Sequence, residues 1–268
     1  MINDSKVNVD GLTINTRRSG EGRDTILFVH GNSCSSEFWN SQLNNLDLRQ
    51  DFSLIAIDLP GHGDSGRSDD YSLKFLADVL ARTIQELSLN RYVLVGLSYG
   101  TALIAETAPK LKNCNGYFLA SPNITSDDFP PNRYIIPFPE LLTMISATVD
   151  KETLRRFAAH LAGDPSSPLV DEFCKSYEET DPMFRTDLGI AMQKASWSDE
   201  FKNLINSRTP VEYVFGEKDQ AMDIHYMDAI KLPGNHKFHF LKDAGHFVNI
   251  DQADKFGRLL NAFCRSVL

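Results

Sequence analysis

Short, wholly apolar runs alternate with amphipathic stretches along the first part of this chain, and that alternation restricts the folds open to it. Four such runs are TILFV, LIAI, YVLVG and YFLA. A strand without polar positions is typical of a sheet covered on both faces. Strands that alternate with helices pair in parallel through right-handed crossovers. We therefore predict an α/β fold with a mostly parallel, doubly wound sheet.

The flanking segments extend this prediction. Asp10 and Gly11 separate two alternating runs, which predicts an N-terminal antiparallel hairpin. Residues 71–89 and 252–267 space their apolar residues as amphipathic helices do. Strands resume at PVEYVFG and HKFHFL, after residue 208.

The alternation stops after Pro122. NITSDDFPPNRYIIPFPELL is rich in proline and aromatic residues, and short helical patterns such as LLTMISATV, TLRRFAAHL and LGIAMQKASW follow it. We expect residues 1–121 and 209–268 to form the core domain, and residues 122–208 to form a helical cap. The cap would cover the carboxyl ends of the strands, where open α/β sheets bind ligands.

Composition excludes several classes of function. The net charge of −9, with no Lys/Arg block, argues against binding to nucleic acid or to an anionic membrane. The four cysteines show no CxxC spacing and the motifs suggest no metal cluster or phosphate-binding loop, so no metal or cofactor is expected. The start is polar and no apolar run is long enough to span a bilayer. We expect a cytoplasmic protein.

The sequence GLSYG, residues 96–100, places Ser98 between two glycines where a strand ends and a helix begins. In this context G-x-S-x-G is typical of a sharp turn that exposes a nucleophilic serine. The N–H of Tyr99 and the start of the helix would lie beside the reacting atom and favour negative charge. Ser98 is thus the candidate nucleophile.

A nucleophilic serine needs a base, and the base needs an acid that orients it. His246, in the loop DAGHFVNID after the last strand, is the candidate base, and Asp219, in VFGEKDQ, is the candidate acid. The order Ser98, Asp219, His246 is that of one hydrolase fold. Glu217, Asp127 and Asp128 remain competitors of Asp219.

We expect the other six histidines to have roles other than that of the base. We interpret His30 and His62 as structural or pocket-lining residues in glycine-rich turns, and His225, His236 and His239 as surface or strand residues. His160 belongs to the expected cap.

Acyl transfer also needs donors for a developing oxyanion. The run FVHGNS ends a strand, and the backbone N–H of Asn32 is placed to act with that of Tyr99. From the cap, Tyr134, Phe138 and Met144 are candidate substrate-binding residues.

The chain resembles the α/β-hydrolase-fold enzymes over nearly its whole length. The motifs that carry this resemblance are HGNS, DLPGHGDSG, GLSYG, GEKD and AGH. The resemblance implies Ser98 as nucleophile, Asp219 as acid, His246 as base, and Asn32 and Tyr99 as oxyanion donors. Serine at the turn argues against the haloalkane dehalogenases and epoxide hydrolases of this fold, which place aspartate there.

A closer similarity is to bacterial N-acyl-homoserine lactonases of this fold, through HGNSCSSEFWNSQL, IAIDLPGHGDS and the stretch from MDAIKLPG to DAGHF. Tyr99 stands where tryptophan would be expected. The resemblance implies a serine hydrolase that cleaves an ester or lactone of a small acyl substrate through an acyl-enzyme. A broad carboxylesterase and a slow-turnover small-molecule receptor remain alternatives, and the oligomeric state is open.

Overall fold

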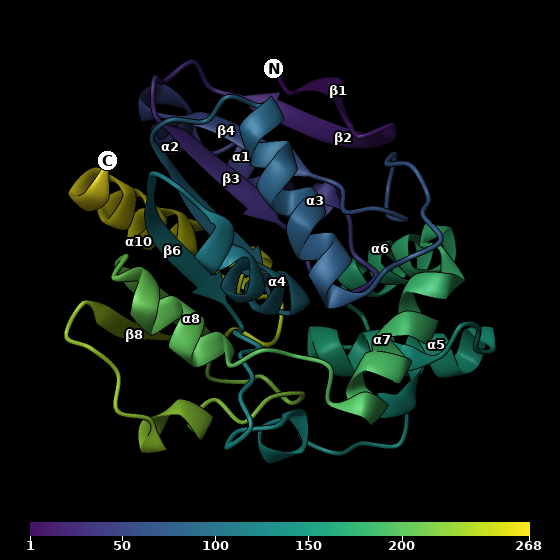
Figure 1. The fold of residues 1–268 in the computed structure, drawn as a ribbon. Coiled ribbons are helices and arrows are strands. Elements are labelled where there is room, and N and C mark those ends of the chain that lie inside the picture. The colour runs from purple at the N-terminus through teal and green to yellow at the C-terminus, as the bar shows by residue number, and fades with distance from the viewer.

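A computed structural model describes residues 1–268, and one eight-stranded sheet runs through it (Figure 1). The strands follow the order β1-β2-β4-β3-β5-β6-β7-β8 across the sheet. They are β1 (Asn3–Val9), β2 (Leu12–Ser19), β3 (Thr25–Val29), β4 (Ser53–Ile57), β5 (Tyr92–Leu97), β6 (Cys114–Ala120), β7 (Val211–Gly216) and β8 (His236–Leu241).

All neighbouring strands from β4 to β8 pair in parallel, whereas β1 pairs with β2 and β2 with β4 in antiparallel fashion. Val9 lies opposite Leu12, so Asp10 and Gly11 form the expected two-residue turn. Both have positive φ, 52° and 90°, which this turn type requires. The predicted α/β fold with an N-terminal hairpin is confirmed.

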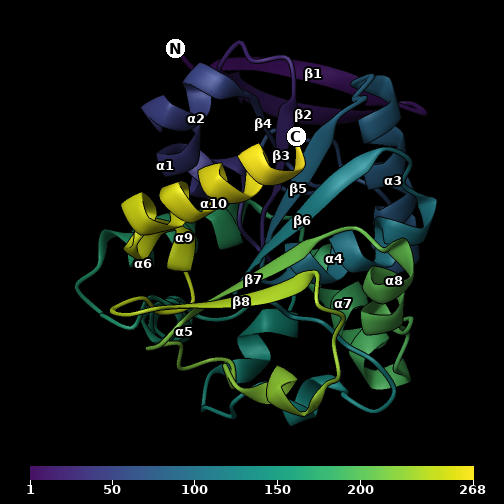
Figure 2. The ribbon, with the colours of Figure 1, turned by 90° about the vertical axis from the view of Figure 1, so that its left-hand side faces the viewer.

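Helices cover both faces of the sheet (Figure 2). One face carries α1 (Asn40–Leu43), α2 (Leu46–Asp51) and α10 (Ala253–Val267), and the other carries α3 (Leu73–Glu86), α4 (Tyr99–Thr107) and α8 (Glu200–Ser207). The helix α9 (Val248–Asp251) and the 3₁₀ turns η1 (Ser36–Trp39), η2 (Ala108–Lys110) and η5 (Tyr226–Ala229) join these elements. None of the helices has both the length and the apolar character that crossing a bilayer demands.

Alternate residues of each central strand enter different hydrophobic clusters. Ile26 and Phe28 of β3 pack toward α10, whereas Leu27 and Val29 pack toward α3 and α4. Burial of successive side chains on opposite faces is the reason why these strands are so rich in apolar residues.

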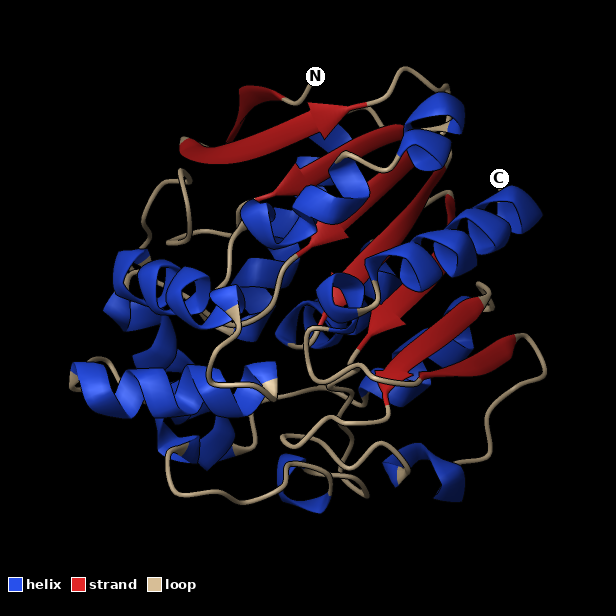
Figure 3. Ribbon diagram, turned by 180° about the vertical axis from the view of Figure 1, so that it is seen from behind, coloured by secondary structure: helices blue, strands red, loops and turns tan.

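Between β6 and β7 the chain forms no strand. It contains η3 (Pro131–Arg133), η4 (Leu141–Ile145), α5 (Lys151–Ala162), α6 (Pro168–Glu179), α7 (Pro182–Lys194) and α8. Figures 1 and 3 show α5, α6 and α7 beyond the arrowheads of the parallel strands. Buried side chains of α5, α6 and α7 join the two clusters of the sheet. The helix α8 packs beside α4 and adds Phe201 and Leu204 to one of these clusters.

Candidate active site

The turn between β5 and α4 holds Ser98 in a strained backbone conformation, with φ of 50°. A Cβ on Gly100 would lie 2.5 Å from the carbonyl oxygen of Val29, and one on Gly96 would lie 2.9 Å from backbone atoms of Gly100 and Thr101. The turn therefore requires glycine at both flanks because the backbones approach so closely. This close packing holds the Ser98 side chain beyond the end of the sheet.

His246 and Asp219 lie together at the same end of the sheet. Nδ1 of His246 is 2.8 Å from Oδ2 of Asp219, and both side chains are buried. Oδ1 of Asp219 accepts hydrogen bonds from the backbone N–H groups of Ala221 and Met222 at 2.9 and 3.2 Å. These bonds fix the carboxylate, and the carboxylate in turn fixes the imidazole ring with Nε2 free.

The environment of His246 favours its protonated form. Burial by itself lowers the pKa of this imidazole, but the charge and hydrogen bond of Asp219, helped by Asp251, outweigh burial and raise the pKa above its usual value. A buried base with a raised pKa is suited to accepting a proton from a hydroxyl group.

The competing acids lie elsewhere. Glu217, Asp127 and Asp128 are exposed and form no hydrogen bond with His246.

Two of the other histidines, His30 and His62, are fully buried and stabilise turns. Leu59 donates its N–H to Nε2 of His30, and Nδ1 of His62 bonds the Pro60 carbonyl. Neither lines the cavity at Ser98.

Asn32 and Tyr99 bring two backbone N–H groups to the site. Tyr99 is the first residue of α4, so its N–H lacks an intrahelical acceptor. The N–H of Asn32 has no partner within the protein. The Asn32 side chain is held on both sides, because Ser33 donates to its Oδ1 and its Nδ2 donates to the Met144 carbonyl, each at 2.8 Å.

Arg185 of α7 supports this loop, although no motif in the sequence points to it. It is 2 % exposed and donates to the carbonyls of Ser146 and Ala147 at 2.8 Å, to the Tyr177 carbonyl and to Oγ of Ser33. The segment LLTMISATV forms only the turn η4, instead of the predicted helix, and Arg185 binds the Ser146 and Ala147 carbonyls where the chain leaves that turn.

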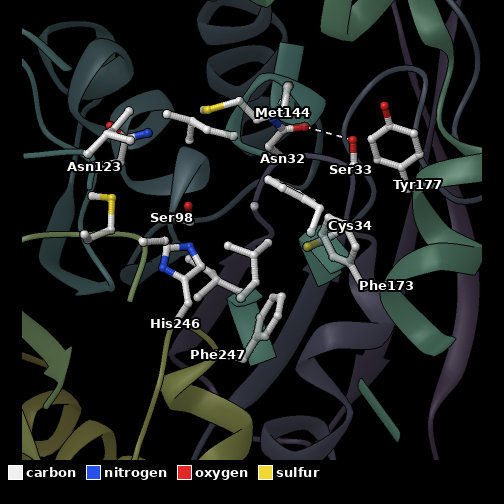
Figure 4. Close-up of a pocket in the computed structure, with 18 of the residues that line it drawn as sticks. Asn32, Ser33, Cys34, Ser98, Asn123, Met144, Phe173, Tyr177, His246 and Phe247 are labelled. Atoms are coloured by element: carbon white, nitrogen blue, oxygen red, sulfur yellow. Dashed lines mark hydrogen bonds between the residues drawn. The ribbon is translucent and has the colours of Figure 1, made fainter. Parts of the chain in front are cut away.

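An apolar cavity lies beside Ser98 and His246 (Figure 4), and 13 of its 19 lining residues are hydrophobic. Phe138 and Met144 border it, together with Phe157, Leu161 and Phe173. Tyr134 does not border it, which corrects the expectation that this residue contacts substrate. Its ring is 1 % exposed and stacks on Tyr226, and its hydroxyl donates to Asn123.

The fold and this site define an α/β hydrolase. Residues 26–259 match the Alpha/beta hydrolase family, so the chain belongs to that family. Among relatives, the chain is 29% identical over 262 residues to the dihydrolipoyllysine-residue acetyltransferase component of the acetoin cleaving system from Cupriavidus necator, covering 94% of this chain and 66% of that protein. It therefore spans just under two thirds of that relative's length.

One further relative and one solved structure match nearly end to end. A pimeloyl-[acyl-carrier protein] methyl ester esterase from Pseudoalteromonas atlantica is 25% identical over 254 residues, covering 91% of this chain and 95% of the esterase. A crystal structure of a variant of the N-acyl homoserine lactonase AidH, complexed with N-hexanoyl homoserine, superposes with a TM-score of 0.89 at 22% identity, covering 100% and 98% of the two chains. That second likeness establishes the fold.

Proposed function

We propose that this chain is a serine hydrolase of carboxylic esters or lactones that works through an acyl-enzyme on Ser98. One observation carries the proposal: His246, held at 2.8 Å by the buried Asp219 carboxylate, borders the same apolar cavity as Ser98, a serine on a strained strand-to-helix turn. A hydroxyl, an imidazole and a carboxylate so arranged are the parts of the Ser-His-Asp mechanism.

In the first step Nε2 of His246 takes the Ser98 proton while Oγ bonds the carbonyl carbon of the substrate. The carbonyl oxygen becomes an oxyanion, which the N–H groups of Asn32 and Tyr99 stabilise. The imidazolium then gives its proton to the leaving oxygen as the bond from carbon to that oxygen breaks. Water, deprotonated by His246, finally releases the acid and restores Ser98.

The apolar cavity suits an acyl tail, since burial stabilises a bound chain by about 0.8 kcal/mol per methylene. We propose N-acyl-homoserine lactones as the first substrate class, supported by the lactonase whose fold this chain shares. Open-chain esters are the second class, supported by the related methyl ester esterase.

Ser98→Ala tests the proposal, with Ser166→Ala, at an exposed loop position, as the matched control. A fluorophosphonate should label the wild type and the control but not Ser98→Ala, which should lose turnover by several orders of magnitude. Near-normal turnover by Ser98→Ala would overturn the mechanism.

The substrate class needs a second comparison. Hexanoyl-homoserine lactone and an open-chain hexanoate ester should be assayed with the same enzyme. A higher kcat/KM for the lactone than for the ester supports the first substrate class. Cleavage of the ester without opening of the lactone supports a carboxylesterase. Stoichiometric binding without turnover of either would indicate a receptor.

A further inference from the structure

A second cavity meets the first at Ser98. The two share Asn32, Ser98, Asn123, Ile135 and Met144, and they are similar in size, about 650 and 680 Å³ when the space at their open mouths is included. Ser98 thus lies where two spaces join, and a bond cleaved there would have one part of the substrate in each.

Asn123 presents donors at this junction. The Tyr134 hydroxyl donates to Oδ1 of Asn123 and is itself 2.8 Å from Oγ1 of Thr125. This chain of hydroxyls orients the amide and leaves its NH₂ group without a partner in the protein. Figure 4 shows Ser98 between Asn123 and His246, which places the amide on the side of the serine away from the base.

Glu200 of α8 lines the second cavity and is 1 % exposed. Its Oε2 accepts the N–H of Thr125 at 2.7 Å, and Oε1 has no partner in the protein. Burial raises the pKa of this carboxyl well above its usual value, since no cation compensates a charge there. When Glu200 is protonated, Oε2 remains the acceptor for Thr125, so Oε1 carries the proton and can donate it to a ligand in the cavity.

Trp197 also lines the cavity, and its indole N–H is buried without a hydrogen-bond partner. A buried N–H without an acceptor is costly, which favours an acceptor oxygen in the adjoining space. No lysine, arginine or histidine borders the cavity.

We propose that this second cavity binds the leaving-group part of the substrate, and that it selects an uncharged group carrying an acceptor oxygen for Asn123, Trp197 and Glu200. The acyl chain then occupies the first cavity. No cationic side chain on the walls of the second cavity would hold an anion, and the buried Glu200 is the only carboxyl there. This inference rests on the proposed ester or lactone hydrolysis.

Three hexanoate esters with leaving groups of similar size test the selection: tetrahydropyran-4-ol, cyclohexanol and choline. The wild type should favour the tetrahydropyranyl ester over the cyclohexyl ester by about tenfold in kcat/KM, the effect of one satisfied buried donor. Glu200→Leu should remove most of this preference. Glu200→Gln, which keeps an N–H donor and an acceptor for Thr125, should restore it.

Glu178→Gln, at an exposed position of α6, is the matched control and should leave the preference unchanged. A wild-type preference for the choline ester, or equal losses in Glu200→Gln and Glu200→Leu, would overturn the proposal. If Glu200→Leu and Trp197→Phe both kept the wild-type preference for the tetrahydropyranyl ester, the proposed subsite would be overturned, but the serine mechanism would not.

A binding measurement separates this proposal from the proposed function. The chain has two tryptophans, and Trp39 is fully buried in the core, so fluorescence changes on binding should come from Trp197. In Ser98→Ala the tetrahydropyranyl ester should change the emission, and adding Trp197→Phe should abolish the change. No change in Ser98→Ala would overturn the subsite even if the wild type hydrolyses every ester.

Discussion

The Asp219 carboxylate lies 2.8 Å from Nδ1 of His246 although the two residues belong to separate loops, one after β7 and one after β8. The parallel pairing of these strands brings both loops to one edge of the sheet. The contact is buried, so its electrostatic effect on the imidazole is weakly screened by solvent.

The first prediction concerns pH. His246 accepts a proton only when neutral, and its pKa is raised above 6.5, so kcat/KM should increase with pH and reach half its plateau above pH 6.5. Asp219→Asn should move this midpoint to lower pH and reduce kcat by about 10⁴-fold, as expected for loss of the orienting carboxylate.

Glu217→Gln is the matched control for this experiment, since Glu217 is exposed in the same loop. It should keep both the midpoint and kcat. A pH profile of Asp219→Asn identical to the wild type would contradict the proposed coupling.

The second prediction concerns the glycines at the turn. Gly100→Ala places a Cβ 2.5 Å from the Val29 carbonyl oxygen and 2.6 Å from that of His30, and backbone atoms cannot move aside easily. The free energy of unfolding should fall by about 1–3 kcal/mol. Gly234→Ala, where nothing lies within 4 Å, should change it by less than about 1 kcal/mol. Urea denaturation measures both, and equal effects would refute the close-packing argument.

The third prediction concerns Arg185. Lysine cannot replace its planar set of donors, so Arg185→Lys should leave the carbonyls of Ser146, Ala147 and Tyr177 without the Arg185 donors and lower stability by about 3 kcal/mol. Because Ser33 also loses its donor, kcat should fall more than KM rises. Arg155→Lys, at an exposed position of α5, should leave the denaturation midpoint in place. A wild-type kcat in a folded Arg185→Lys enzyme would exclude any role in positioning the Asn32 loop.

The fourth prediction concerns the acyl chain. In a series of matched acyl lengths, kcat/KM should rise by up to about fourfold per methylene until the apolar cavity is full. Leu161→Phe fills part of that cavity and should move the optimum to a shorter chain. Leu142→Phe is the control, since Leu142 is 68% exposed. A flat profile in the wild type would reject the acyl cavity.

Local patterns were sufficient for the sheet and for the candidate triad. Apolar strands such as β3 are predictable because both faces of a central strand are buried, and Asp10-Gly11 is predictable because its turn needs positive φ. Ser98, Asp219 and His246 follow strand ends, and parallel strands bring such ends together whatever the details of packing. The sequence by itself therefore determined the fold class and which residues could meet.

Tertiary structure alone decided the remainder of the site. Tyr134 and Glu200 look like ordinary residues of a loop and of a helix start, yet packing of α8 beside α4 buries Glu200, and stacking on Tyr226 turns Tyr134 toward Asn123. Arg185 gains its role from carbonyls distant in sequence. Such contacts depend on burial and on the relative orientation of helices and strands. Neither can be predicted from the local periodicity of the sequence.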